Sequence, residues 1–482
     1  MRYLLYIIFL FFTTHFILAF LCLKSYANRL EDIGEFNRLD TLIHPSRLQE
    51  AKFDVPVWQN LEKEIFDGNF GLMHSVLIVN DNKLIVEKYY NKWQKDTIHD
   101  IQSATKSVAS ALIGIAIDKG FIKSVNKKMV SMFADFTFDR SDSLKKTIRL
   151  KDMLTMSAGI QWNEQTIMYN EPGNSLTDMY ALEKNWIEYI LKLPVTDTPG
   201  TKFNYSSGIS ILLGKIIEQS TKMSVQKFAE KYLFGPLGIQ KYHWSEYFGV
   251  AHCGGGLYLT PLDMAKIGNL YYNEGSLEGK QIISKNWIKE SLLPRFRTDY
   301  KTSYGYQWWI MDSLFDFRPV PFASGNGWQF IFIIKEFKMV VVTTGHNYAQ
   351  EAPKTTMSYT ELIYSILSSN PQFQKRIKNI YEQQLNLEPA NFYDVFVLAY
   401  CLNRQGEYAK TITYLEKVEN RYSGDLRLNF LMGEAYYYTG DIAKAKPHLE
   451  RCIAICDEHN YPKPGYFKWQ QVSWKNWQTS GG

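Results

Sequence analysis

Two pairs of apolar segments, far apart in the chain, predict two β-hairpins. Residues 75–79 and 84–90 flank an Asn-Asp-Asn-Lys sequence at 80–83, which is rich in turn-forming residues. Residues 330–335 and 339–344 form the second pair. Because the segments between the two pairs are largely helical in pattern, the first and last strands are expected to meet in one sheet.

An apolar stretch of small and branched residues at 104–116 predicts a buried helix. Ser103 and Lys106 stand at its start, three residues apart. On a helix this spacing puts both on one face, and the free N–H groups of the first turn favour negative charge near the hydroxyl. A lysine amine buried there has a lowered pKa and accepts a proton. The pair is therefore a candidate nucleophile and base.

The Ser-x-x-Lys spacing is not specific by itself. It recurs in three polar stretches where the lysine would stay solvated, at Ser124/Lys127, Ser143/Lys146 and Ser224/Lys227. For Ser103 and Lys106 the alternative to a catalytic pair is a helix cap with an exposed lysine.

Two later segments carry further candidate groups. Tyr205 lies in a loop that leads into a second apolar helix at 209–217. Near a lysine and a serine it would act as a proton shuttle, because cationic neighbours lower the pKa of a phenol; a packed aromatic with a solvated hydroxyl is the alternative. Gly325 and Gly327 precede the second hairpin. Glycines at a strand edge let backbone N–H groups approach a substrate and face an oxyanion, or they form an ordinary turn.

These three segments, in this order, resemble those of the serine β-lactamase and penicillin-binding-protein superfamily. The resemblance covers residues 70–368 and is closest to the branch of class C β-lactamases, esterases and 6-aminohexanoate-dimer hydrolases. Residues 147–160 (TIRLKDMLTMSAGI) are similar to the family's LLTMTSGI helix and turn. PLGI at 236–239 is similar to its PLGM, and GGGLYLTPLDMAK at 254–266 is similar to its GGL..T..D.A pattern.

The resemblance implies an α+β fold, in which an antiparallel sheet carries helices on both faces and a helical subdomain spans residues 120–250. It implies that Ser103 is the acylated nucleophile, Lys106 its base partner and Tyr205 the second proton carrier. The oxyanion would be held by the N–H of Ser103 and by that of Asn326, beside Gly325. Ser207 and Ser324, in the second and third motifs, would lie at the substrate.

Two positions depart from the family pattern. Ser207 stands where β-lactamases of this branch have Asn, and Ala323-Ser324-Gly325 stands where they have Lys-Thr-Gly. The missing lysine removes the cation that would pair with a β-lactam carboxylate. An ester or amide, neutral or differently charged, is therefore expected as substrate in preference to penicillins or cephalosporins. Arg295 and Arg297 are the candidates for a replacement charge.

Composition narrows the class of protein. The chain has 482 residues, 45% of them apolar and 21% charged, as expected for a folded protein of two or three domains. A net charge of +5 without a basic run gives no indication of nucleic-acid binding. The nine histidines show no zinc-binding spacing, so no metal or cofactor is predicted. The scattered cysteines are predicted to be core thiols: Cys22, Cys253, Cys401, Cys452 and Cys456.

The N-terminus has the features of an export signal. A short basic start precedes an apolar run at 3–23, and Ser25 and Ala27 supply the small residues that a signal peptidase needs. The run is also long enough to span a bilayer, so 1–27 is expected to be a cleaved signal peptide or an uncleaved membrane anchor. Cys22 lacks a preceding small residue, which argues against a lipoprotein site. The rest of the chain is expected to be periplasmic or extracellular.

The C-terminal part differs in character. A Ser-Ser-Asn-Pro sequence at 368–371 interrupts the chain, and a charged helix is predicted at 375–384. A 34-residue repeat follows, in which Leu398, Gly406 and Leu415 are matched by Met432, Gly440 and Leu449. The spacing resembles tetratricopeptide repeats. Two repeats bury little core alone, so they are expected to dock on the rest of the chain. They form either a groove for a peptide or protein partner or a stabilising cap.

The predicted division is a signal or anchor at 1–27, a β-lactamase-like hydrolase domain at 28–368, a linker helix at 369–390, two repeats at 391–460 and a tail at 461–482. The predicted function is an exported serine hydrolase that cleaves a small ester or amide through an acyl-enzyme on Ser103. The alternative is a catalytically weak protein that recognises peptidoglycan or penicillin and recruits partners through its repeats.

Overall fold

The computed structural model describes residues 45–139, 142–182, 185–299, 302–311, 319–348, 358–384 and 392–458. The predicted signal or anchor, 1–27, and the tail, 461–482, lie outside these residues. In the described ranges no helix is both long and apolar enough to cross a membrane.

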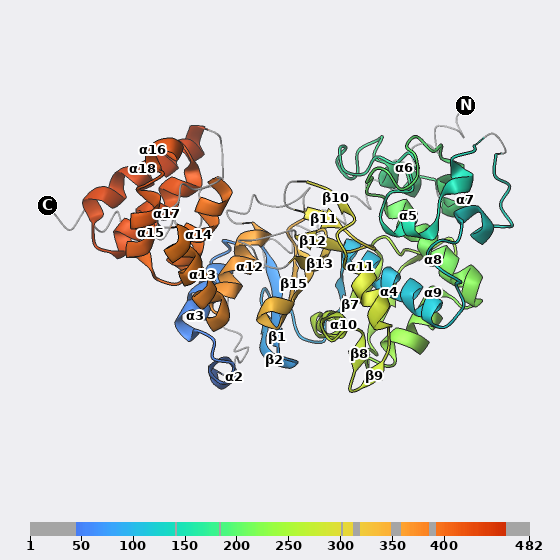
Figure 1. The fold of residues 1–482 in the computed structure, drawn as a ribbon, viewed down its shortest axis with the longest axis horizontal. Coiled ribbons are helices and arrows are strands. Elements are labelled where there is room, and N and C mark those ends of the chain that lie inside the picture. The colour runs from blue at the N-terminus through green and yellow to red at the C-terminus, as the bar shows by residue number, and fades with distance from the viewer. Residues whose placement is uncertain are drawn as a thin grey trace, which may run out of the picture. The chain divides into compact units, whose positions relative to one another are not determined.

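An antiparallel sheet of eight strands forms the centre of the fold (Figure 1), in the order β10-β11-β12-β13-β14-β15-β1-β2. Its strands are β1 (Met73–Asn80), β2 (Lys83–Tyr89), β10 (Phe296–Arg297), β11 (Thr302–Tyr304), β12 (Trp309–Met311), β13 (Val320–Gly325), β14 (Gln329–Ile334) and β15 (Met339–Gly345). Strand β1 pairs with β15, so the prediction that the first and last strands meet in one sheet is confirmed.

Both predicted hairpins are present. Strands β1 and β2 are joined by Asp81 and Asn82, whose φ angles of 47° and 65° are those of a tight hairpin turn. Strands β14 and β15 are joined by a 3₁₀ turn at Lys335–Phe337 and by Lys338, with φ of 54°. In the first hairpin the turn residues, Asp and Asn, tolerate the left-handed region and so help to fix the register of the strands.

One face of the sheet is covered by α4 (Thr105–Asp118), α10 (Pro261–Tyr272) and α11 (Lys285–Ser291), as Figure 1 shows, and α8 (Ser207–Thr221) packs on the far side of α4. Helix α4 is apolar all round because it is buried all round, as its sequence predicted. The helical subdomain adds α5 (Leu150–Leu154), α6 (Ser175–Tyr180), α7 (Trp186–Lys192) and α9 (Val225–Ala229). Gly268 lets α10 lie close to the sheet, because a Cβ there would stand 2.5 Å from Val340.

The opposite face is covered by α2 (Pro45–Glu50), α3 (Val55–Phe66), α12 (Tyr359–Ser368) and α13 (Pro371–Gln384). Side chains of β1 alternate between the two faces: Leu77 and Val79 join one hydrophobic core, and Val76 and Ile78 join the other. The predicted interruption at 368–371 separates α12 from α13. Helix α13 begins four residues earlier than predicted, because the Asn370 side chain accepts from the N–H groups of Gln372 and Phe373.

The C-terminal repeat consists of two helical hairpins. Their helices are α14 (Phe392–Arg404), α15 (Tyr408–Leu415), α17 (Leu426–Tyr438) and α18 (Ile442–Glu458), with a short α16 (Glu419–Tyr422) between the pairs. Gly406 and Gly440 have φ of 74° and 85° and end the first helix of each pair. Gly433 permits a close helix crossing, since a Cβ there would lie 2.6 Å from Leu449. The 34-residue repeat of the sequence thus corresponds to a repeated helical hairpin in the structure.

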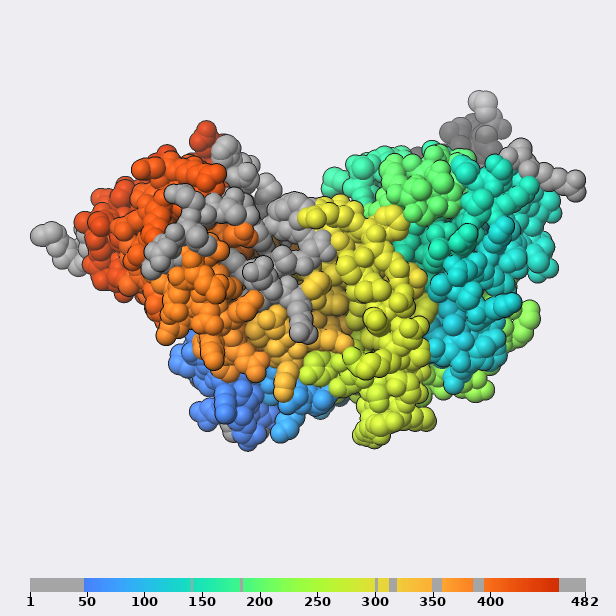
Figure 2. Space-filling model, viewed as in Figure 1, coloured from blue at the N-terminus to red at the C-terminus, as the bar shows by residue number. Residues whose placement is uncertain are grey.

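The repeat shares a core with the outer face of the sheet. Val395 and Leu398 of α14 belong to the same hydrophobic cluster as Ile366 of α12, Ile377 of α13 and Val341 of β15. Figure 2 shows the orange and red surface of the repeat continuing from that of α12 and α13, with the blue surface of α2 and α3 beneath. The predicted docking of the repeat on the rest of the chain is confirmed.

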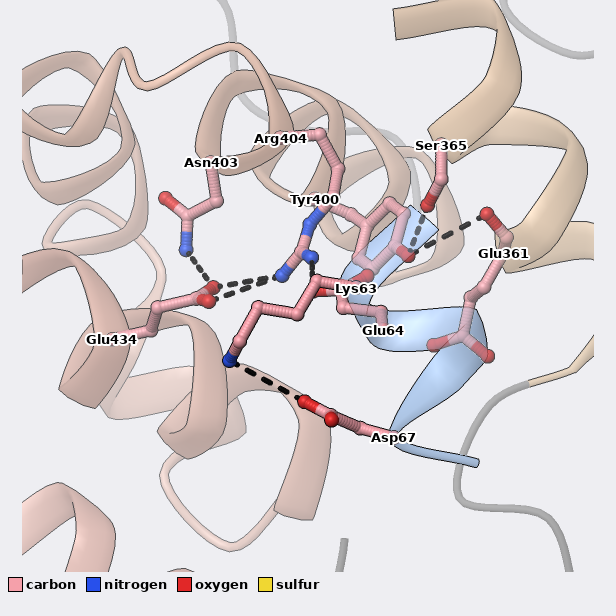
Figure 3. Close-up of polar contacts among 9 residues, drawn as sticks. All are labelled: Lys63, Glu64, Asp67, Glu361, Ser365, Tyr400, Asn403, Arg404 and Glu434. Atoms are coloured by element: carbon pink, nitrogen blue, oxygen red, sulfur yellow. Dashed lines mark hydrogen bonds and ion pairs between the residues drawn. The ribbon is translucent and has the colours of Figure 1, made fainter. Parts of the chain in front are cut away.

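A partly buried charge cluster ties the repeat to α3 (Figure 3). The Arg404 guanidinium of α14 pairs with Glu64 of α3 and, at 3.0 Å, with Glu434 of α17. Close by, the Tyr400 hydroxyl lies 2.7 Å from Ser365 Oγ of α12. The first repeat is therefore held to two helices that cover the sheet.

Candidate active site

The candidate nucleophile, Ser103, lies in a 3₁₀ turn (Gln102–Ala104) that runs directly into α4. The prediction placed it in the first turn of the α-helix; the structure places it just before. Gln102 has φ of 50°, a strained value for a residue other than glycine. Its backbone N–H and side-chain amide both donate to the Asp100 carboxylate, at 2.9 and 2.7 Å. Asp100 thus holds the turn that presents the hydroxyl.

Lys106 is buried at the predicted position, one turn along from Ser103, with 1% of its surface exposed. Its Nζ lies 2.9 Å from Ser103 Oγ, 2.9 Å from Ser207 Oγ and 2.6 Å from the carbonyl oxygen of Gly254. Burial lowers the pKa of Lys106 from 10.5 to about 8, although the Glu164 carboxylate acts in the opposite direction. The alternative of a helix cap with an exposed lysine is wrong.

Tyr205 also lies beside Lys106 and Ser103. Lys106 Nζ lies 4.8 Å from the Tyr205 ring centroid, and the Ser103 hydroxyl is close enough to act on the pKa of Tyr205. The expected lowering of its pKa is wrong. Burial, the neighbouring Tyr304 and the Glu164 carboxylate raise the pKa of Tyr205 well above the usual range. At neutral pH Tyr205 is therefore a phenol that donates a proton, and the group able to accept one is Lys106.

A buried carboxylate that the sequence analysis did not identify, Glu164, completes the cluster. Its Oε1 accepts from the Ser207 hydroxyl at 2.6 Å and from the Tyr169 hydroxyl at 3.2 Å. Its Oε2 accepts from the Ser207 backbone N–H and from Trp162 Nε1, both at 2.7 Å. It lies four residues beyond the 147–160 motif. No spacing rule links it to Ser207, so its role appears only in three dimensions.

The third motif forms the end of strand β13. Gly325 packs against the nucleophile turn so closely that a Cβ there would stand 2.2 Å from the Ile101 carbonyl oxygen. Ser324 and Asn326 face the same pocket as Ser103. Ala323 is completely buried in the core beneath the strand. The structure therefore brings together all seven residues that the sequence analysis proposed for the site.

The pocket at this point has a volume of about 410 Å³. One wall is the segment 164–169, and the rest is formed by Ser103, Tyr205, Trp309, Ser324 and Asn326. None of these lining residues, all in the described part of the chain, carries a cationic side chain. Arg295 instead pairs with Glu290 at 2.5 Å, and Arg297 Nε donates to the Asp299 carbonyl. Neither arginine lines the pocket in place of the missing lysine.

The described residues contain no group of three or more His, Cys, Asp or Glu side chains placed to hold a metal ion. Cys253, Cys401, Cys452 and Cys456 are buried free thiols, as predicted, and Cys22 lies outside the described residues.

Comparison with known proteins agrees with this geometry. The beta-lactamase family model matches residues 71–355, and a tetratricopeptide repeat model matches 396–425 and 428–456. The 6-aminohexanoate-dimer hydrolase of Paenarthrobacter ureafaciens is 22% identical over 258 residues, covering 48% of this chain and 63% of that protein. The chain spans less than two thirds of the length of the curated relatives it matches first.

Solved structures show the same fold. The octameric penicillin-binding protein homologue from Pyrococcus abyssi superposes with a TM-score of 0.52 at 19% identity, covering 67% of this chain and 81% of that one. A beta-lactamase/D-alanine carboxypeptidase from Yersinia pestis gives 0.52 at 17% identity, covering 64% and 97%. At these identities the likeness concerns the fold alone. The family match covers more than half of the chain, and with the geometry above it shows that this protein belongs to the beta-lactamase family of serine hydrolases.

Proposed function

We propose that the protein hydrolyses a small ester or amide through an acyl-enzyme on Ser103. The observation that carries the proposal is the buried Lys106 amine, 2.9 Å from the Ser103 hydroxyl and with a pKa lowered to about 8. Lys106 takes the hydroxyl proton while Ser103 Oγ bonds to the substrate carbonyl carbon. The bond to the leaving group then breaks as Tyr205 donates its proton to the departing oxygen or nitrogen.

Hydrolysis of the acyl-enzyme completes the proposed cycle. Water adds to the acyl carbon and loses a proton to the Tyr205 phenolate, and Ser103 leaves with the proton that the Lys106 ammonium returns to it as the free acid is released. We place the oxyanion at the backbone N–H groups of Ser103 and Asn326. The close contact of Gly325 with the turn around Ser103 supports this placement.

The proposed substrate is neutral at the end that faces β13. Among the residues that the structure describes, the pocket lining offers one carboxylate, Glu164, and no cation, so a substrate carboxylate bound beside them would lose solvation without gaining a partner. A β-lactam antibiotic carries such a carboxylate. Simple esters or amides are therefore the expected substrates.

Export is proposed from the sequence alone. The apolar run at 3–23 and the small residues after it support a signal peptide or an anchor, with the enzyme in the periplasm or outside the cell. Cell fractionation of the full chain, with detection of a C-terminal tag, tests this placement independently of activity. Recovery in the cytoplasm would contradict it.

The catalytic proposal is tested by covalent labelling. A fluorophosphonate probe should label Ser103 of the purified protein, and Ser103→Ala should abolish labelling and p-nitrophenyl ester turnover without changing the thermal midpoint. The wild-type protein should hydrolyse short p-nitrophenyl esters faster than nitrocefin. An adduct on another serine would refute the nucleophile. Penicillin binding without ester turnover would favour the alternative of a catalytically weak recognition protein.

A further inference from the structure

The Lys106 amine has three polar neighbours that compete for its two N–H groups and its lone pair. They are Ser103 Oγ, Ser207 Oγ and the Gly254 carbonyl oxygen, all within 2.9 Å of Nζ. To act as a base, the amine must be neutral, and its lone pair must face the Ser103 hydroxyl. The Gly254 carbonyl can only accept, so it takes one N–H. The two serines then divide the second N–H and the lone pair between them.

The Glu164 carboxylate decides this division. A carboxylate only accepts, and its Oε1 lies 2.6 Å from Ser207 Oγ, so Ser207 gives its single hydroxyl proton to Glu164. Ser207 has no proton left for the amine and accepts the second N–H of Lys106. The lone pair of Lys106 is thereby left for Ser103.

We propose that Glu164 is a positioning residue, which acts through Ser207 to point the lone pair of the Lys106 amine at the Ser103 hydroxyl. Without a partner, the Ser207 hydroxyl could either donate to the Lys106 amine or accept from it. The Glu164 carboxylate takes the hydroxyl proton, so Ser207 can only accept from Lys106. The inference rests on the proposed function, in which Lys106 is the base for Ser103. Glu164 is only 3% exposed and accepts from four donors, which fits an orienting role.

The position and the charge of Glu164 affect the pH–rate profile in different ways. Its negative charge raises the pKa of Lys106 against the effect of burial. Loss of the charge alone would therefore move the pH–rate profile to lower pH and leave the high-pH plateau unchanged. Loss of the orientation lowers the plateau itself, because the amine is already neutral there.

Glu164→Gln separates the two. The single carbonyl oxygen of the glutamine would take the Oε2 position, where two N–H donors meet. Its NH₂ would then donate to Ser207, whose hydroxyl proton would turn to the Lys106 lone pair. We expect the plateau of kcat/KM for a p-nitrophenyl ester to fall about 10-fold or more, with the midpoint shifted to lower pH. A shifted midpoint with an unchanged plateau would overturn the proposal.

A double-mutant cycle makes the test independent of one variant's folding. Ser207→Ala should lower the plateau to a similar extent, and Ser207→Ala with Glu164→Gln should lower it little further, because both changes break one relay. Multiplied losses in the double variant would overturn the proposal. Ser210→Ala, on the same helix and 2.7 Å from the Gln307 amide oxygen, removes a buried hydroxyl away from the pocket and serves as the control. Fluorophosphonate labelling of the wild type at Ser103 separates a failure here from a failure of the proposed function.

Discussion

At the scale of single residues, burial determines which group takes and which group gives a proton. The same removal from water disfavours the ammonium form of Lys106 and the phenolate form of Tyr205, so it lowers one pKa and raises the other. Ordinary values of 10.5 and 10.0 would leave both groups protonated at neutral pH. Burial instead brings the pKa of Lys106 down to about 8, so the neutral amine becomes available as a base near that pH, while Tyr205 stays a phenol and acts as the acid.

The pH dependence of activity follows from these shifts. The base form of Lys106 is the neutral amine, which is present above its pKa, so kcat/KM for a p-nitrophenyl ester should rise through a midpoint of about 8. The raised pKa of Tyr205 means that no fall should follow just above that midpoint. Steady-state rates from pH 6 to 10, corrected for spontaneous hydrolysis, measure this. A midpoint near 10.5, or a bell centred on pH 7, would contradict the assignment.

Tyr205→Phe should lower turnover by about 10²–10⁴-fold, because the leaving group loses its positioned proton donor. The effect should be greater for an amide or alkyl ester than for a p-nitrophenyl ester, whose leaving group needs no proton. Tyr271→Phe is a matched control, since Tyr271 is a completely buried tyrosine on α10, away from the pocket. Equal activity of Tyr205→Phe and the control on an alkyl ester would show that Lys106 or water supplies the proton.

At the scale of elements, the site depends on how closely strand β13 approaches the turn before α4. Their backbones meet where Gly325 packs on the Ile101 carbonyl. The strained Gln102 and the Asp100 carboxylate hold the turn from one side. The glycine lets the strand hold it from the other.

Gly325→Ala tests that contact. Its Cβ would stand 2.2 Å from the Ile101 carbonyl oxygen, so strand and turn must separate. A displacement of this kind lowers kcat/KM by about 10²-fold when a reacting group is misplaced by about 1 Å. Gly424→Ala is the control, because a Cβ there would meet no atom within 4 Å. Unchanged kcat/KM and an unchanged thermal midpoint in Gly325→Ala would show that the close approach is not required.

At the scale of the whole molecule, the repeat is part of the structure that supports the sheet. Its first hairpin shares the hydrophobic core under β15, and Arg404 is held between two carboxylates from different parts of the chain. Burial raises the pKa of Glu64, while the Arg404 guanidinium opposes that effect. These observations favour the stabilising cap, and binding of a partner by the repeat stays a prediction.

Arg404→Leu should lower the free energy of unfolding by about 3 kcal/mol, the low end of the range for a buried pair, because it leaves the partly buried Glu64 and Glu434 without their cation. The loss should be smaller at pH 5 than at pH 8, because burial raises the pKa of Glu64 and protonation of that carboxylate removes its unpaired charge. Chemical denaturation at both pH values measures it. Lys446→Leu is the control, because the Lys446–Glu450 pair is exposed and contributes about 0–1 kcal/mol. Equal effects of the two substitutions would contradict the anchoring role of Arg404.

Much of the fold and the core of the candidate site were predictable from local patterns. The hairpin turn at Asp81 and Asn82, the apolar helix after Ser103 and the 34-residue period each lie in a short stretch whose residues determine their own backbone. Ser103 and Lys106 could be paired because three residues on a helix are close in space. Tyr205 and Gly325 were found through family motifs. Each motif is a short stretch of sequence, and the order of the motifs can be read directly along the chain.

Other features were decided by contacts between distant segments, which no local pattern records. Glu164 meets Ser207 across 43 residues, Lys106 meets Gly254 across 148, and Arg404 meets Glu64 across 340. The sequence alone determined which chemical groups are present and which local elements carry them. Only the tertiary structure decided which groups are buried together. That burial determines the direction in which each pKa shifts and the direction of each hydrogen bond. Desolvation and hydrogen-bond direction depend on the complete surroundings of an atom, and folding assembles those surroundings from the whole chain.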